Sequence, residues 1–300
     1  MDIELNKSPI QKIEDSLLLQ KGVSLYIKRD DLIHPLVQGN KWRKLKYNLL
    51  NAREEGQHTL VTFGGYYSNH IYATAAAAKL FNFKAIGIIR GEEPVVKSET
   101  LQFALAQGMQ LVYVERATYD RKEDDSFIGE LKMRYGPFYY VPEGGTNLLA
   151  LKGVSEIINE IEIDFDVICT ACGTGGTLAG LVAGLQGQKQ ALGFSALKGT
   201  DALTPKVNQL LADYGKPGLS NFHINFEYHF GGYAKIKPEL IEFIKDFKAK
   251  FDIQLEPVYT GKMLYGVFDL IKQDYFKMGS TIIALHTGGL QGLSGYKSIL

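Results

Sequence analysis

The chain has 300 residues, of which 45% are hydrophobic and 22% are charged, an ordinary composition for a globular protein with a sizeable core. Its 33 Lys and Arg residues equal its 33 Asp and Glu residues, so the formal net charge is zero. This balance argues against nucleic-acid binding through a basic surface and against binding to anionic membranes, and it favours a small neutral or zwitterionic substrate.

The N-terminal segment shows no targeting signal. Residues 1–7 include acidic side chains and lack the apolar stretch that a signal peptide requires. No apolar run approaches the roughly 18 residues of a membrane-spanning helix, and the richest candidate, residues 73–80, contains Lys79. We therefore expect a soluble, cytoplasmic protein with no membrane partner.

In the first half of the chain, short apolar segments alternate with helical patterns. Helices are expected from the Gly64-Gly65 turn to Leu80, at 98–107 and at 121–135. Strands that alternate with helices are typical of βαβ units and a parallel sheet. The expected strands are residues 59–63, 84–89, 110–114 and 138–141.

The second half repeats this alternation after a turn-rich segment, residues 142–147, where we expect a domain boundary. Residues 200–233 are harder to interpret, with one expected helix at 204–214 followed by irregular, aromatic-rich chain. The other expected strands are 165–169, 192–197 and 280–285, and the other expected helices are 148–160, the segment ending at 185, 238–251 and 262–273.

The two cysteines, Cys169 and Cys172, have the spacing of a redox dithiol or of half a metal site. A structural zinc site needs about four ligands, but the chain has no second cysteine pair and its six histidines are scattered. We expect no metal site, and we favour two small hydrophobic side chains at the end of a buried strand.

A glycine-rich segment follows that strand and opens a helix. Its unpaired N–H groups and the helix dipole favour a phosphate, and glycine lets the backbone approach one closely. The segment matches neither Gly-x-Gly-x-x-Gly nor a P-loop, and a tight strand–helix turn is the alternative interpretation. We favour a phosphate site of unnamed ligand, formed by Gly173, Thr174, Gly175, Gly176 and Thr177.

Two further segments contain candidate catalytic or ligand-binding side chains. Lys41 lies in a basic run with Arg43, Lys44 and Lys46, and its spacing alone favours a solvated helix face. An imine-forming lysine would instead need burial and positive neighbours to lose its proton. Ser68-Asn69 has the chemistry of a helix cap, but it follows an expected parallel strand, where ligands bind.

Five short motifs occur along the chain in a fixed order: YIKRDDL at 26–32, GNKWRKL at 39–45, SNH at 68–70, PVYTGK at 257–262 and HTGG at 286–289. With these motifs the chain resembles the aminocyclopropanecarboxylate deaminase and D-cysteine desulfhydrase family of fold-type II pyridoxal-phosphate enzymes. The resemblance covers nearly the whole chain and is far more specific than the glycine-rich segment alone.

The resemblance implies an α/β protein with two three-layer domains, each with a twisted, mostly parallel sheet, as in the β-subunit of tryptophan synthase. Residues 1–46 and 144–300 would form the large domain that binds the cofactor phosphate, and residues 47–143 the small domain. Pyridoxal 5'-phosphate would lie between them. The family also implies a homodimer acting on a small amino acid.

Site residues follow from the same resemblance. Lys41 matches the lysine that forms the Schiff base, and Asn69 matches the residue that bonds the cofactor's ring hydroxyl. Ser68 matches a residue near the substrate carboxylate and α-carbon. Tyr259 matches an active-site tyrosine, and Tyr233 matches a second one. The glycine-rich segment, residues 173–177, would hold the phosphate.

Thr260 and Thr287 favour the desulfhydrase over the deaminase, which has Glu and Leu at these positions. A carboxylate beside the pyridine nitrogen keeps that nitrogen protonated and strengthens the electron sink, whereas a threonine hydroxyl cannot. We therefore predict elimination of D-cysteine, or a related β-substituted amino acid, to pyruvate, ammonia and sulfide. The deaminase giving 2-oxobutyrate and ammonia, another β-eliminase or racemase, and a non-catalytic ligand-binding protein stay open as alternatives.

Two departures from the family bear on the substrate. Val37-Gln38 precedes Gly39 where the family often has two glycines, and Tyr66-Tyr67 precedes Ser68 where smaller or amide residues are common. Two additional aromatic rings could narrow the pocket or change its ligand.

Overall fold

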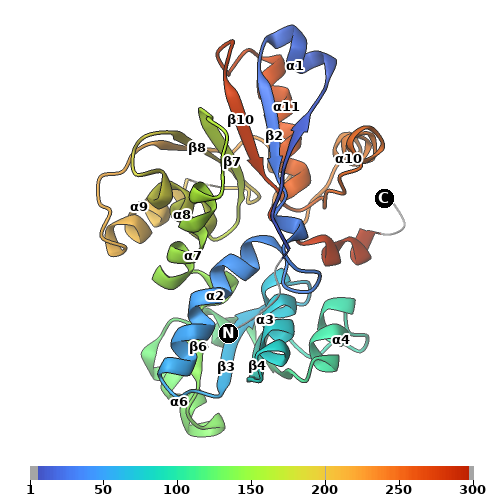
Figure 1. The fold of residues 1–300 in the computed structure, drawn as a ribbon. Helices are drawn as coiled ribbons and strands as arrows, with labels where there is room; N and C mark the ends of the chain where they lie inside the picture. The colour runs from blue at the N-terminus through green and yellow to red at the C-terminus, as the bar shows by residue number, and fades with distance from the viewer. Residues whose placement is uncertain (1–5, 200, 297–300) are drawn as a thin grey trace.

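Two β-sheets with helices on both faces organise this computed structural model, which describes residues 6–199 and 201–296 (Figure 1). The four-stranded sheet has the order β5-β4-β3-β6, and all of its neighbouring strands are parallel. Its strands are β3 (Thr59–Gly64), β4 (Lys84–Arg90), β5 (Gln110–Val114) and β6 (Tyr139–Val141).

The six-stranded sheet has the order β1-β2-β10-β7-β8-β9, and only β1 runs antiparallel to its neighbour. Its β2 and β10 are adjacent although they lie at opposite ends of the sequence. The strands are β1 (Ile10–Ile13), β2 (Ser24–Lys28), β7 (Val167–Cys172), β8 (Gln190–Ser195), β9 (Phe222–Asn225) and β10 (Thr281–Leu285).

Eleven α-helices and three 3₁₀-helices connect these strands within the described residues. The 3₁₀-helices are η1 (Asp30–Leu32), η2 (Glu143–Gly145) and η3 (Leu290–Tyr296). The α-helices are α1 (Ser16–Lys21), α2 (Gly39–Glu54), α3 (Asn69–Leu80), α4 (Glu99–Ala106), α5 (Arg116–Asp120), α6 (Asp125–Tyr135), α7 (Leu148–Asn159), α8 (Gly176–Leu185), α9 (Leu203–Asp213), α10 (Pro238–Phe251) and α11 (Thr260–Lys272).

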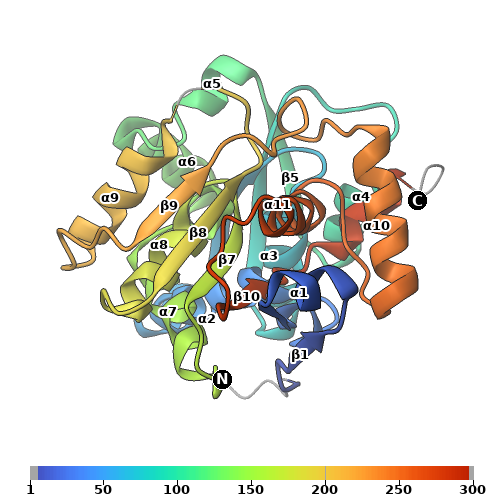
Figure 2. The same cartoon turned by 90° about the horizontal axis from the view of Figure 1, so that it is seen from above.

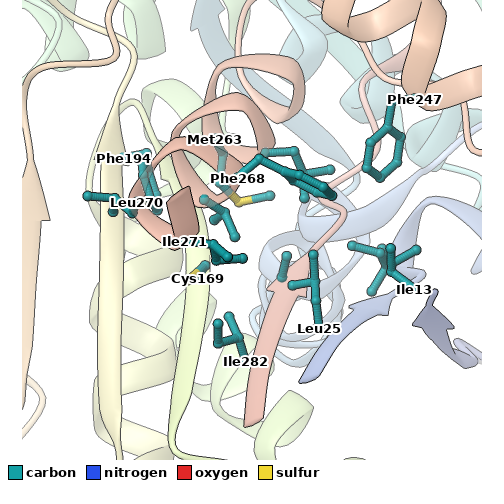
Figure 3. Close-up of a cluster of buried hydrophobic side chains, with 14 of the residues drawn as sticks. Ile13, Leu25, Cys169, Phe194, Phe247, Met263, Phe268, Leu270, Ile271 and Ile282 are labelled. Atoms are coloured by element: carbon teal, nitrogen blue, oxygen red, sulfur yellow. The ribbon is translucent and has the colours of Figure 1, made fainter. Parts of the chain in front are cut away.

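Helices cover both faces of each sheet, which explains why strands such as β7 are almost continuously apolar. The view from above shows α10 and α11 on one side of the six-stranded sheet and α7, α8 and α9 on the other (Figure 2). In α10, the buried side chains of Leu240, Ile244 and Phe247 recur at helical spacing. They join a core between α11 and the sheet that includes Cys169 and Ile282 (Figure 3).

The predicted α/β architecture with mostly parallel sheets is confirmed. The proposed division into domains stays a prediction; its boundary between residues 46 and 47 lies inside α2, which is one continuous helix that packs against both α7 and α3. Both cysteines are free and buried, as predicted for small hydrophobic side chains. No helix among the described residues is long and apolar enough to span a membrane.

Several local predictions need correction. The sequence pattern missed β1, β2, α1 and β9, the last of which lies in the stretch considered irregular. The single helix expected at 121–135 begins only at Asp125, and the separate short helix α5 precedes it. The strand expected at 165–169 is β7, which starts two residues later and extends to Cys172, next to the glycine-rich segment.

Candidate functional site

A cavity of about 630 Å³ is lined by residues that follow the carboxyl ends of strands from both sheets. Gly65 follows β3, Arg90 ends β4, Cys172 ends β7 and Thr287 follows β10. In parallel α/β proteins these strand ends are where ligands bind, because the loops there converge from several strands. The topology therefore gathers segments that are distant in sequence around one cavity.

Most of the predicted site residues line this cavity. The two exceptions are Gly176 and Thr260, which are buried just behind it at the first positions of α8 and α11. The predicted residues that line the cavity are Lys41, Ser68, Asn69, Gly173, Thr174, Gly175, Thr177, Tyr233, Tyr259 and Thr287.

Lys41 is the third residue of α2, and its Nζ lies 3.4 Å from the carbonyl oxygen of Gly144, to which it donates. Burial lowers the pKa of Lys41 to about 8, although the negative charge of Glu143 opposes this shift. A lysine with this pKa is neutral about a tenth of the time at pH 7, far more often than an ordinary lysine. Lys41 is therefore poised to act as a nucleophile.

The rest of the basic run is not a solvated face, contrary to what spacing alone favoured. The Arg43 guanidinium is buried and pairs with Asp30 at 3.1 Å and with Glu160 at 2.7 Å. At Gly153 of α7, a Cβ atom would lie 2.0 Å from the Arg43 carbonyl oxygen, so α7 packs directly on α2. This anchored helix holds Lys41 at the cavity wall.

A second lysine and a histidine lie beside Lys41. Lys44 is buried and donates to the Gly144 carbonyl at 3.3 Å and to Thr146 Oγ1 at 3.1 Å. Burial, reinforced by the charge of Lys41, holds the pKa of Lys44 well below its ordinary value. The cavity thus has two lysines from one helical turn, both with lowered pKa values.

His70 is neutral, and its hydrogen bonds identify its tautomer. Burial, together with the nearby lysine charges, holds the pKa of His70 well below its ordinary value. The Thr62 hydroxyl donates to the Val141 carbonyl at 2.8 Å, so it accepts from His70 Nε2 at 2.7 Å. Nδ1 is then a buried acceptor without a partner among the described residues.

The glycine-rich segment has the features of a phosphate cradle. Gly175 precedes α8 with φ of 84° and provides no side-chain cap, so the first N–H groups of the helix lack a side-chain acceptor. Asn40 Nδ2 donates to Thr177 Oγ1 at 2.9 Å, which leaves the Thr177 hydroxyl proton free to donate. A Cβ atom at Gly173 would lie 3.2 Å from the Tyr259 ring. These features fit a bound phosphate group.

Ser68 and Asn69 combine a capping role with a position in the cavity. Ser68 Oγ accepts from the Ile71 amide at 3.3 Å at the start of α3. Asn69 Oδ1 accepts from Gln291 Nε2 at 2.6 Å, so the Asn69 amide nitrogen can donate elsewhere. The helix η3, which carries Gln291, therefore orients the Asn69 amide.

Two tyrosines also line the cavity. The rings of Tyr233 and Tyr259 are 6.1 Å apart in an edge-to-face arrangement. Burial raises the pKa of Tyr259 well above its ordinary value, and burial also raises the pKa of Tyr233. Both hydroxyls are therefore protonated near neutral pH and can donate hydrogen bonds.

The two threonines that distinguish the family members occupy different environments. Thr287 lines the cavity, whereas Thr260 is fully buried and its Oγ1 donates to Glu256 Oε1 at 3.2 Å. The Glu256 carboxylate accepts three backbone N–H groups at the start of α11, at 2.8, 2.8 and 2.6 Å. Burial raises the Glu256 pKa, which these bonds oppose. The sequence interpretation had considered neither Glu256 nor its position behind Thr260.

Sequence reasoning also missed several lining residues. Glu143 and Arg90 stand directly at or after the carboxyl ends of β6 and β4, and the rule that identified Ser68 would have found them. Arg116 likewise stands two positions after the end of β5. Lys44 and Gln291 have no comparable local signal, because only packing brings them to the cavity.

The chain resembles known proteins over nearly its whole length. The family model described as "Pyridoxal-phosphate dependent enzyme" matches residues 5–288. A Pyrococcus horikoshii protein named "Putative 1-aminocyclopropane-1-carboxylate deaminase" is 32% identical over 97% of this chain and 91% of its own length. The D-cysteine desulfhydrase of Yersinia enterocolitica is 30% identical over 99% of this chain and 95% of its own length. A crystal structure of an ACC deaminase homologue superposes with a TM-score of 0.84 at 30% identity, covering 97% of this chain and 92% of its own.

Proposed function

Because the chain belongs to the family of pyridoxal-phosphate dependent enzymes, we propose that it is a lyase acting on D-cysteine or a related β-substituted amino acid. The net reaction with D-cysteine consumes one water and yields pyruvate, ammonia and hydrogen sulfide. When bound, pyridoxal phosphate supplies an electron sink for negative charge that develops at the substrate's α-carbon. The residues around the cavity fit this cofactor.

The phosphate would be held by the glycine-rich segment at the start of α8, where N–H groups and the Thr177 hydroxyl are available. Asn69, oriented by Gln291, would donate to the ring hydroxyl. Lys41 would bind the cofactor through its Nζ, which its lowered pKa favours. Lys44 adds a second amine beside the same cradle.

The single observation that carries the choice of reaction is the side chain at position 260, where the deaminase pattern has Glu and this chain has Thr260. Glu143 is the one carboxylate among the described lining residues, and it acts on Lys41, since its charge raises the pKa of that lysine. A neutral hydroxyl at position 260 supports a moderate electron sink, which suffices for a substrate with an α-proton and a β-leaving group. Opening a cyclopropane ring requires a stronger electron sink.

Lys41 and its neighbours would move the proton. Lys41 Nζ would take the α-proton of the bound substrate, the C–H electron pair would form the Cα–Cβ double bond, and the C–S electron pair would leave with the thiolate. Tyr259, which is protonated because burial raises its pKa, lines the same cavity and can donate a hydrogen bond there. Ser68 Oγ lines the cavity near the N-terminus of α3. A positioned base of this kind contributes about 10²–10⁴-fold to the rate.

A substrate panel tests the proposal. D- and L-cysteine, β-chloro-D-alanine, D-serine and 1-aminocyclopropane-1-carboxylate would be assayed for keto acid and ammonia. We expect pyruvate from D-cysteine to form faster than 2-oxobutyrate from the cyclopropane substrate. Faster formation of 2-oxobutyrate would instead establish the deaminase, which the similarity to the Pyrococcus protein makes the second candidate.

The pH dependence of Lys41 reactivity provides a separate prediction. In protein freed of cofactor, labelling of Lys41 by an amine reagent should rise with pH and reach half its maximum near pH 8, because only the neutral amine reacts. Glu143→Gln should move this midpoint downward, since it removes the charge that raises the Lys41 pKa. Peptide mass spectrometry would measure the labelling. A midpoint near the ordinary value of 10.5 would contradict the assignment.

A cytoplasmic location and a homodimeric assembly belong to the same proposal. They rest on the family resemblance.

A further inference from the structure

Two arginines that line the cavity stand at or just after the ends of neighbouring strands. Arg90 is the last residue of β4 and Arg116 is the first residue of α5, two positions after β5 ends. The strands β4 and β5 are parallel neighbours in which Arg90 lies opposite Val114. Both arginines line the cavity and both are exposed to solvent. The sheet register therefore brings the backbone positions of two cavity-lining arginines close together.

Neither arginine has an acidic partner within the described parts of the chain. No ion pair joins Arg90 or Arg116 to a carboxylate there, although other surface arginines such as Arg121 make such pairs. Arg90 instead lies over the ring of Tyr119, with its guanidinium carbon 5.7 Å from the ring centroid. Both positive charges are therefore available to a ligand.

The one carboxylate among the described residues that line the cavity is engaged elsewhere. Glu143 Oε1 accepts from the Tyr119 hydroxyl at 2.6 Å, and Glu143 Oε2 lies 3.6 Å from Lys122 Nζ. Arg90 lies over the face of the Tyr119 ring, whereas the Tyr119 hydroxyl donates to Glu143. Glu143 consequently leaves the charge of the two arginines uncompensated.

The arginines also lie close to the segment that would meet the substrate. A Cβ atom at Gly65 would be 4.0 Å from Arg90 Nη2, and Gly65 precedes Ser68 by three residues. The Tyr66 hydroxyl donates to the Glu92 carbonyl, so this tyrosine is tied to the loop that follows Arg90. Arg90 therefore lies beside the loop that leads from β3 to Ser68.

We infer that Arg90 and Arg116 bind a second anionic group, carried on the β-substituent of the substrate. This inference rests on the proposed function, in which the glycine-rich segment would hold the cofactor phosphate, Asn69 would bond the ring hydroxyl and Ser68 would lie near the substrate's α-carboxylate. Those assignments leave the two guanidinium groups without an anion. The substrate class is then a β-substituted amino acid whose leaving group bears a carboxylate or a similar acid. The elimination is unchanged, and the leaving thiol carries the additional charge away.

Two isosteric thioethers test this inference. S-(carboxymethyl)cysteine and S-(carbamoylmethyl)cysteine differ in the charge of one terminal group, and each would be assayed in its D and L forms with the holoenzyme. We expect kcat/KM for pyruvate formation to favour the carboxylate by about ten- to a hundredfold, the usual range for hydrogen bonds to charged groups. In the double variant Arg90→Met/Arg116→Met the ratio should fall toward one.

A matched control and a binding measurement distinguish failure of the anion-site inference from failure of the proposed function. Arg134→Met, an exposed arginine of α6 outside the cavity, should keep the wild-type ratio. Equal kcat/KM for the two thioethers, or a preference that survives in the double variant, would overturn the inference while the proposed function stands. Absence of keto acid from the thioethers and from cysteine would overturn the proposed function.

Calorimetric binding of both thioethers to the Lys41→Ala variant tests the anion site independently of turnover. The carboxylate should bind about tenfold or more tightly than the amide, and this difference should disappear when Arg90→Met and Arg116→Met are added. Equal dissociation constants would overturn the inference even if the enzyme had another reaction.

Discussion

Replacing Lys41 with alanine is expected to reduce turnover of D-cysteine by at least about 10²–10⁴-fold, the contribution of a positioned general base. The variant loses both the amine that would bind the cofactor and the base at the substrate's α-carbon. Lys41 is suited to both tasks because burial lowers its pKa to about 8. Steady-state assay of pyruvate would measure the effect.

Lys46→Ala is the matched control for this variant. Lys46 belongs to the same helix and the same basic run, but its side chain pairs with Glu156 at 2.7 Å outside the cavity. We expect this control to retain wild-type turnover, because an ion pair of this partly exposed kind contributes little. Full turnover in Lys41→Ala would exclude the assigned role of Lys41.

Gly39→Ala is expected to cause the second large effect, on stability as well as on the site. A Cβ atom at Gly39 would lie 2.0 Å from the Thr287 carbonyl oxygen and 2.9 Å from the Gly288 amide nitrogen. Gly39 also has φ of +55°, which disfavours a residue with a side chain. We expect a loss of about 2–4 kcal/mol in the free energy of unfolding, from backbone displacement and conformational strain together.

The reason this glycine matters is its position between two parts of the site. It begins α2, which carries Lys41, and it touches the segment after β10, which carries Thr287. Displacing either element would also weaken cofactor binding. Denaturant unfolding and cofactor titration would measure the two effects.

Gly56→Ala separates conformational strain from the clash. Gly56 has φ of +67°, similar to that of Gly39, but nothing lies within 4 Å of the Cβ position. This control should lose only about 1 kcal/mol, the lower end of the cost of a strained backbone position. If Gly39→Ala proved no more destabilising than Gly56→Ala, the close approach to Thr287 would not be important for stability.

The alternation of strands and helices could be predicted where periodicity is local. The four strands of the smaller sheet and the helices α7 and α10 follow directly from short apolar runs and helical spacing. The local sequence pattern did not predict strands whose pairing partners lie far away along the chain. β2, for example, pairs with β10, which lies more than 250 residues away along the chain. Its short sequence contains no information about that neighbour.

The candidate site was predictable mainly through the ordered motifs. From local sequence alone, Lys41 resembles a surface lysine, because its neighbours are basic. Tertiary packing buries it nevertheless. The structure shows the missing cause, since Asp30 and Glu160 neutralise Arg43 and let α2 pack inward. The strand-end rule points to Arg90 and Arg116 one by one, but their pairing was not predictable, because only the β4–β5 register brings them together.

Reduction of the holoenzyme with borohydride, followed by peptide mass spectrometry, would identify the lysine that holds the cofactor. Borohydride would fix the cofactor to that lysine, and the cavity contains two candidates in the same helical turn, Lys41 and Lys44. We expect bleaching of the yellow protein and a phosphopyridoxyl adduct on Lys41. An adduct on Lys44, or no adduct on either lysine, would show that Lys41 does not hold the cofactor.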